Sequence, residues 1–270
     1  FGGDNAEADG LAGFAGDLCV DGALGSRTAA LTSPYSDATT SGHLYLDDGQ
    51  IRDHVVWCTE RGVQAGFHVI GDLAMAAVAS GLRMASEKVG AALLVGARHR
   101  LEHVEMCSPA AIATLAALGV VASVQPAFDA AWGGPGELYE QRLGVARAAP
   151  MNPFASMRRA GVTLAFGSDS PVTPLDPWGA IRAAVWHHNR DERLSMRAAF
   201  AAHTQGGHRA RHDDASGVLA PGTDASYAVW DIDTAGNPGV LPETAMDSPS
   251  PGCVRTVVSG GLSFDAEEAS

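Results

Sequence analysis

One alternation of helix, glycine and strand runs through the middle of the chain and constrains the fold more than any other feature. Three stretches with helical character end at Gly62, Gly119 and Gly161, and each glycine is followed at once by an apolar run that begins with valine. Glycine just past a helix suits the left-handed conformation that closes many helices. Strands that alternate with helices form βαβ units around a parallel sheet. The pattern therefore predicts an α/β protein.

The predicted elements can be placed in order along the chain. We expect helices at residues 50–61 and 72–88, and further helices that open at Ser108-Pro109, Asn152-Pro153, Asp176-Pro177 and Ser195. Polar residues before a first turn, and proline within it, are typical of helix starts. We expect parallel strands at residues 17–20, 63–68, 97–104, 120–125 and 162–167. A closed (β/α)₈ barrel needs eight strands. The predicted fold class is therefore α/β, a partial TIM-type barrel with about five of those eight strands.

The chain changes character at residue 217. Turn residues dominate from there, and two strand-like runs, 225–232 and 253–258, follow without helices between them. We therefore expect a barrel portion at residues 1–216 and a small β unit at residues 217–270.

Charge and cysteine content exclude several classes of partner and compartment. The formal charge of −13 argues against nucleic acid and against an anionic membrane surface, because both attract clustered Lys and Arg. The four cysteines are widely spaced and include no CxxC pair, which predicts a reducing compartment, the cytoplasm, rather than a disulfide framework. The longest apolar stretch, residues 109–124, is interrupted by polar residues and glycine, so it predicts a helix and a strand rather than a membrane span.

Polar side chains stand at the ends of the predicted strands. They are Asp17, His68, His103, Gln125 and Asp169. Reacting groups of a parallel barrel lie where its strands end and the following loops begin. Two histidines and an aspartate that meet there suit Zn²⁺ or a similar divalent ion. Each residue alone is more simply a satisfied core or loop residue, and only the joint pattern predicts a metal site.

Other residues carry weaker signals. Arg27, after a glycine-rich turn, has two equal interpretations: a ligand for a substrate anion or a partner for a backbone carbonyl. His187 and His188 end a predicted helix, where its dipole favours cations, so we interpret them as a helix-end pair. His208 and His212 are interpreted as solvated.

Four motifs carry a more specific resemblance. The strings DGALGSRTAA at residues 21–30, FHVIGD at 67–72, RLEHVE at 100–105 and FGSDSPV at 166–172 occur in this order. Together they resemble the YtcJ-like branch of the amidohydrolase superfamily, which includes N-substituted formamide deformylases. The resemblance covers roughly residues 19–264, which is nearly the whole chain.

The resemblance implies roles for the residues at the strand ends. His68 and His103 match the metal-binding histidines of barrel strands five and six. Asp169 matches the strand-eight aspartate, which is a metal ligand and the general base. Residues 217–270 match the strands that return into a small β-sandwich. Asp17 stands where many relatives have a metal-bridging lysine, and although an aspartate can bind a metal it cannot form a carbamate bridge.

The family's first-strand His-x-His pair occurs nowhere in this sequence. The resemblance therefore implies the C-terminal portion of such an enzyme, with an open sheet edge. The expected activity is hydrolysis of an amide-type C–N bond in a small-molecule substrate, with zinc as the divalent metal and with Arg27 and Gln125 as substrate-binding residues. Deamination or isomerisation on the same fold, and an inactive fragment that lacks the His-x-His ligands, are the alternatives. The sequence leaves open whether the chain forms a homo-oligomer.

Overall fold

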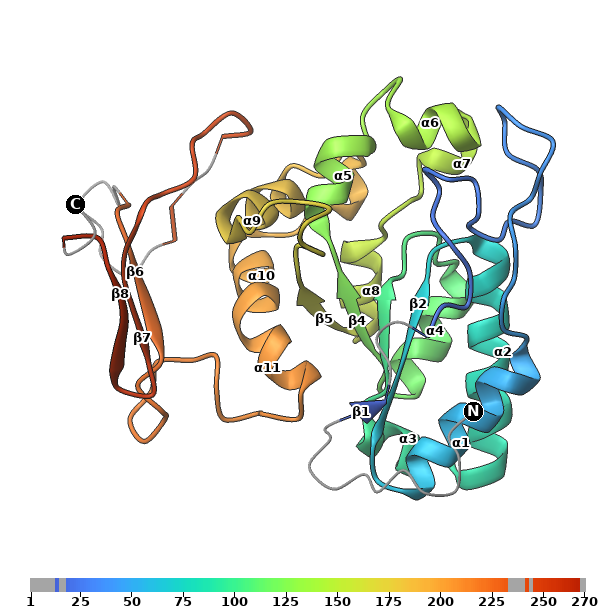
Figure 1. The fold of residues 1–270 in the computed structure, drawn as a ribbon, viewed down its shortest axis with the longest axis horizontal. Helices are drawn as coiled ribbons and strands as arrows, with labels where there is room; N and C mark the ends of the chain where they lie inside the picture. The colour runs from blue at the N-terminus through green and yellow to red at the C-terminus, as the bar shows by residue number, and fades with distance from the viewer. Residues whose placement is uncertain (1–12, 15–17, 233–240, 243–244, 268–270) are drawn as a thin grey trace.

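A parallel sheet organises most of the chain, as the sequence predicts (Figure 1). The computed structural model describes residues 13–14, 18–232, 241–242 and 245–267. The parallel strands lie side by side in chain order: β1 (Gly13–Phe14), β2 (Gln64–Val69), β3 (Arg100–His103), β4 (Val121–Val124) and β5 (Thr163–Phe166). Within the described residues β5 pairs only with β4, so the sheet does not close into a barrel.

Helices cover the sheet in the order in which the chain visits the strands. Those that pack against one another in succession are α1 (Asp48–Glu60), α2 (Asp72–Val89), α4 (Pro109–Ala117) and α8 (Phe154–Ala160), with α3 (Ala91–Ala97) leading into β3. After β4 come α5 (Pro126–Trp132), α6 (Leu138–Leu143) and α7 (Val145–Ala148). After β5 come α9 (Pro177–Val185), a 3₁₀ turn η1 (Arg190–Glu192), α10 (Met196–Ala201), a π-helical turn η2 (Ala202–Gly206) and α11 (Gly207–Ala210). No helix in the described part of the chain is both long and apolar enough for a membrane span.

The predicted helix starts are confirmed in most cases. The side chains of Ser108, Asp176 and Ser195 each accept a hydrogen bond from a backbone N–H in the first turn. The predicted opening at Asn152-Pro153 is one residue early, because Pro153 itself caps α8. The glycines that follow α1, α4 and α8 all have positive φ, between 65° and 93°, which explains why the sequence has glycine there.

A second, antiparallel sheet lies at the C-terminal end (Figure 1). It contains β6 (Tyr227–Trp230), β7 (Cys253–Val258) and β8 (Gly261–Asp265) in this order. Trp230 packs edge-on against Trp178 of α9, with ring centroids 6.0 Å apart, and so contacts the main body. Two of these strands match the predicted runs, whereas β8 was not predicted. The division between residues 216 and 217 stays a prediction.

Three local predictions differ from the structure. The strand expected at residues 97–104 begins only at Arg100, because α3 extends to Ala97 and Arg98 ends it in the left-handed conformation. The short helices α5–α7 were not predicted. The strand expected at residues 17–20 is present in part, since Cys19 forms a parallel bridge with His68, but Asp17 lies outside the described residues.

The loop at residues 21–30 is fixed to the end of β2 by one buried carboxylate. Asp21 is 0% exposed, and its two oxygens accept hydrogen bonds from the backbone N–H groups of Ala30, Ile70 and Gly71 at 2.8–3.0 Å. Gly71 has to be glycine, because a Cβ there would lie 2.0 Å from the carbonyl oxygen of Ala30. Burial raises the pKa of Asp21 to about 6, and the three N–H donors oppose that rise. The carboxylate therefore holds two segments together directly beside His68.

We expect Asp21→Asn to lower the free energy of unfolding by roughly 2–3 kcal/mol, because an amide nitrogen would replace an oxygen that faces backbone N–H donors. Urea denaturation followed by circular dichroism measures the change. Asp53→Asn, which alters an exposed carboxylate beside Arg52, is the control and should change stability by less than about 0.5 kcal/mol. Equal effects of the two substitutions would show that Asp21 does not hold the loop.

His99 links α1, β2 and β3 through both ring nitrogens. It is 1% exposed, and its Nδ1 accepts a hydrogen bond from the backbone N–H of Ala65 at 2.9 Å. The proton is therefore on Nε2, which lies 2.9 Å from Thr59 Oγ1. Burial lowers the pKa of His99 from 6.5 to about 4, and His54 and His212 add to the decrease. The lowered pKa favours the neutral form of the His99 ring near pH 7.

Because the folded state binds the His99 proton less tightly than the unfolded state does, stability should fall as the pH drops from about 6.5 to about 4. The loss should be on the order of 3 kcal/mol over that window. Urea midpoints at pH 7, 6 and 5 test this in the parent protein and in His99→Gln, which should show a shallower decrease. His43→Gln, at an exposed histidine, should keep the parental slope. An unchanged slope in His99→Gln would contradict the assignment.

Candidate metal centre

The predicted site residues follow neighbouring strands at one edge of the parallel sheet. His68 lies in β2, His103 ends β3, Gln125 follows β4, and Asp169 comes three residues after β5. The carboxyl ends of parallel strands meet at the same edge, so the fold places these four residues along it. Asp17, the fifth, lies outside the described residues.

Two of the predicted ligands are in direct contact. The rings of His68 and His103 lie 4.5 Å apart between centroids, at an interplanar angle of 70°. The His103 residue is 8% exposed and the His68 side chain 18%, so the pair is mostly buried but reachable. The structure therefore brings together residues that are 35 positions apart in the sequence.

Hydrogen bonds fix which nitrogen of each ring can bind a metal. The Nε2 of His68 lies 3.1 Å from the carbonyl oxygen of Gly22, which only accepts, so the proton is on Nε2 and the lone pair on Nδ1. The Nδ1 of His103 lies 2.9 Å from Oε1 of Gln125, which places its proton there and its lone pair on Nε2. Ligating histidines in proteins are usually oriented by such a carbonyl partner. The two imidazoles therefore suit a divalent ion such as zinc.

Backbone strain is concentrated at the same edge. His103, Val104 and Asp169 have φ values of 71°, 54° and 53°. This left-handed region costs a residue with a side chain about 1–2 kcal/mol, and it is least favourable for a β-branched residue such as Val104. Val104 is held there because it is fully buried and its N–H donates to the carbonyl of Val69 at 3.0 Å. Strain maintained by the surrounding structure is typical of functional sites.

The loop after β5 carries Asp169 on the surface. Asp169 is exposed, and its carbonyl accepts a hydrogen bond from the N–H of Val172 at 2.8 Å, which closes a turn. Its roles as ligand and base stay predictions, because they depend on an ion and a substrate.

The two predicted substrate-binding residues already have partners in the chain. Arg27 donates two hydrogen bonds to Asp37, at 3.0 and 2.8 Å, and Arg142 contacts the same carboxylate. These bonds raise the pKa of Arg27 and lower that of Asp37. Gln125 contacts His103, as described above. Contact of Arg27 or Gln125 with a substrate stays a prediction, and an anion at Arg27 would have to compete with Asp37.

Sequence reasoning missed two buried acids near the site. Asp21 opens one of the four motifs and lies 4.0 Å from Nε2 of His68. Glu105 closes another motif and is 3% exposed, and burial raises its pKa to about 8, which favours the neutral acid. Asp21 was visible as a charged residue between apolar neighbours, and Glu105 as one between Val104 and Met106, which is the signal that could have found them.

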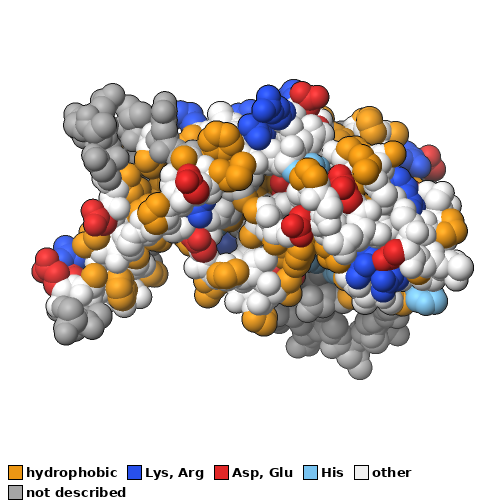
Figure 2. Space-filling view, turned by 90° about the horizontal axis from the view of Figure 1, so that it is seen from above, with side chains coloured by type: hydrophobic (Ala, Val, Ile, Leu, Met, Phe, Trp, Pro, Cys, Tyr) orange, Lys and Arg blue, Asp and Glu red, His pale blue; other side chains and the backbone are white. Residues whose placement is uncertain are grey.

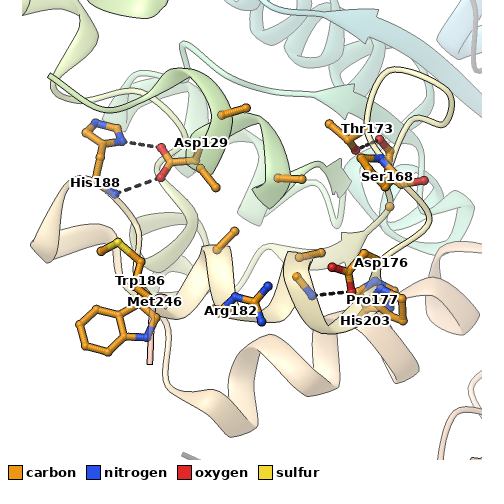
Figure 3. Close-up of a pocket in the computed structure, with 18 of the residues that line it drawn as sticks. Asp129, Ser168, Thr173, Asp176, Pro177, Arg182, Trp186, His188, His203 and Met246 are labelled. Carbon is orange, nitrogen blue, oxygen red and sulfur yellow. Dashed lines mark hydrogen bonds and ion pairs between the residues drawn. The ribbon is translucent and has the colours of Figure 1, made fainter. Parts of the chain in front are cut away.

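A large cavity lies beside this edge, between α5, α9 and the loop after β5 (Figure 3). Its volume is about 970 Å³. Polar residues project from its walls at both ends, with Asp129 and His188 at one end and Ser168, Thr173 and Asp176 at the other. Among the described residues that line it, neither His68 nor His103 occurs, so the cavity does not contain the histidine pair. The face seen in Figure 2 carries acidic and basic side chains interspersed among hydrophobic ones.

Comparison with known proteins identifies the family. Residues 5–264 match the amidohydrolase family, and the chain therefore belongs to it. The chain is 30% identical over 228 residues to YtcJ of Bacillus subtilis (strain 168), a match that covers 78% of this chain and 41% of that protein. It is also 30% identical over 230 residues to the protein LONG AFTER FAR-RED 3 of Arabidopsis thaliana, covering 78% of this chain and 38% of that protein.

Solved structures agree with the family assignment. An uncharacterized metal-dependent hydrolase from Pyrococcus furiosus superposes with a TM-score of 0.68 at 29% identity, covering 77% of this chain and 42% of that one. A triazine hydrolase from Arthrobacter aurescens, at 19% identity and a TM-score of 0.57, shows the same fold over 84% of this chain and 49% of its own. The chain thus spans about two fifths of the length of the curated relatives it matches.

We expect Gln125→Leu to weaken binding of Zn²⁺ by about 10- to 100-fold, because the partner that orients His103 would be lost. Competition with a chromophoric chelator measures the dissociation constant. Gln141→Leu, at a glutamine whose side chain donates to the carbonyl of Gly136, is the matched control and should leave the dissociation constant unchanged. The same affinity in Gln125→Leu as in the parent protein would argue against His103 as a ligand.

Proposed function

We propose that this chain supplies part of the active centre of a zinc-dependent hydrolase that cleaves an amide-type, non-peptide C–N bond in a small molecule. The observation that carries the proposal is the His68–His103 pair, with ring centroids 4.5 Å apart at the carboxyl edge of a parallel sheet. Family membership and the metal-dependent hydrolase among the similar structures support it. The architecture we propose is part of a (β/α)₈ barrel, with residues 217–270 as returning strands of a β-sandwich.

The donor set fits the metal. Two imidazoles oriented by Gly22 and Gln125, together with a carboxylate from Asp169, form a set that zinc accepts. When bound, the ion would supply Lewis acidity that lowers the pKa of water and polarises the scissile carbonyl. Asp17 is proposed as a further ligand.

Asp169 acts as the general base in this proposal. Its carboxylate takes a proton from the attacking water and delivers it to the nitrogen of the leaving group, so the C–N bond breaks as the C–O bond forms. The left-handed backbone of Asp169 fixes where the side chain starts, and the turn closed by Val172 holds the loop. The adjoining cavity, of about 970 Å³, is within the range that small-molecule pockets occupy, and Ser168 lines it directly before Asp169.

We expect Asp169→Asn to reduce turnover by at least about 10²-fold at similar metal content, because the base is lost while the shape is kept. Asparagine tolerates the left-handed region well, so the fold should persist. The test measures hydrolysis of N-substituted formamides by the longest available polypeptide that contains this chain. The metal content of each variant is measured in parallel. Asp17→Asn should mainly reduce metal occupancy.

Asp224→Asn makes the same chemical change at an exposed aspartate near the C-terminal sheet and should leave turnover unaltered. Near-parental turnover in metal-loaded Asp169→Asn would remove Asp169 as the base. Release of ammonia from amino-heterocycles, with no formamide cleavage by the parent protein, would instead favour deamination.

A further inference from the structure

A second group of metal-ligating side chains lies at the wall of the cavity. Asp129 belongs to α5, and His187 and His188 follow the end of α9. One ligand atom from each of the three lies within 4.8 Å of the others. The Nε2 of His187 is 3.2 Å from Oδ1 of Asp129, and Nδ1 of His188 contacts the same oxygen. Figure 3 shows His188 and Asp129 pointing toward each other across the end of the cavity.

The three side chains are buried, so a charge on any of them is costly unless a neighbouring charge balances it. The side chains of His187, Asp129 and His188 are 0%, 2% and 15% exposed. The two imidazoles stack with centroids 4.6 Å apart at an angle of 27°. The two stacked rings cannot both be positively charged at low cost in such a place, since like charges repel strongly when buried.

Backbone groups lie within hydrogen-bonding distance of two of the three side chains. The Nδ1 of His187 lies 3.0 Å from the backbone nitrogen of Asn189, which donates to it, and 3.2 Å from the carbonyl oxygen of the same residue, so the ring can adopt either tautomer here. The tautomer that donates from Nδ1 to the carbonyl leaves the lone pair for a metal on Nε2. The second oxygen of Asp129 accepts a hydrogen bond from the backbone N–H of His188 at 3.0 Å. Its first oxygen faces both rings.

An unsatisfied atom points to a missing ligand. Nε2 of His187 is buried and has no hydrogen-bond partner among the described residues, because its 3.2 Å contact with Asp129 lacks hydrogen-bonding geometry. A buried polar atom in that state costs about 1–3 kcal/mol. An ion beside this nitrogen would give it a partner, and Oδ1 of Asp129, which already contacts His188, lies close enough to be a second ligand.

We propose that Asp129, His187 and His188 bind a divalent transition-metal ion of the zinc class, at a site whose ligands are distinct from His68, His103 and Asp169. Two imidazoles and a carboxylate match the donor preference of zinc, and three protein ligands leave one position for a water or a ligand from the cavity. Asp129 and His188 line that cavity, which gives the ion a way in. The ion joins α5 to the end of α9 and fixes one end of the cavity. The proposal does not depend on the proposed function.

The test separates the two ligand sets with variants of the full 270-residue chain. The His68→Ala/His103→Ala double variant removes one set, and titration with Co²⁺ then reports on the other by the visible absorption of tetrahedral cobalt. We expect the double variant to retain one equivalent with tetrahedral absorption. Adding Asp129→Asn or His187→Gln to it should weaken binding at least 10-fold. His208→Asn, which alters a histidine paired with Asp213, is the matched control and should leave binding unchanged.

A thermal readout covers the case in which a core substitution impairs folding. His188→Asn changes the most exposed of the three ligands, and Zn²⁺ should raise the unfolding temperature of the double variant but not of the double variant with His188→Asn. Absence of Co²⁺ absorption in a folded double variant would overturn the proposal and leave a buried ion-pair cluster. Equal Zn²⁺ stabilisation with and without His188→Asn would overturn it as well. Loss of metal at His68 and His103 alone would affect only the proposed function.

Discussion

The buried carboxylate of Asp21 is the interaction on which the site depends most. It collects three backbone N–H donors, from Ala30, Ile70 and Gly71, and so joins the loop after the first strand to the segment that leaves β2. Charge-assisted hydrogen bonds of this kind are about twice as strong as neutral ones. The same loop brings the carbonyl of Gly22 to Nε2 of His68. The orientation of the first histidine is therefore a consequence of how the loop is held.

The second histidine is oriented by strain as well as by hydrogen bonding. His103 and Val104 both have left-handed backbones, and the burial of Val104 in the core fixes them there. The chain therefore turns sharply at the end of β3 and directs His103 toward His68 and Gln125. The stability of the core under the sheet thus supports a local conformation that an isolated segment would not adopt.

The sequence predicted the parallel strands β2, β3, β4 and β5 because the helix-stop glycines and N-cap residues act locally, whereas it did not predict β1. It predicted His68 and His103 as neighbours because strand ends meet at one edge. It missed α5–α7, since the three short helices of 4–7 residues lack the length over which periodicity is visible. It also interpreted His187 and His188 as a helix-end pair, because their contact with Asp129 joins residues 59 positions apart, and no local pattern encodes that contact.

The contact between α5 and α9 links these observations. Phe128 stacks against His103 with centroids 6.0 Å apart, and the next residue, Asp129, faces His187 and His188. One turn of α5 therefore contacts the histidine pair of the sheet on one side and the cavity on the other. Because protein interiors are close-packed and transmit strain, we expect a displacement of α5 relative to α9 to change how Phe128 packs against His103.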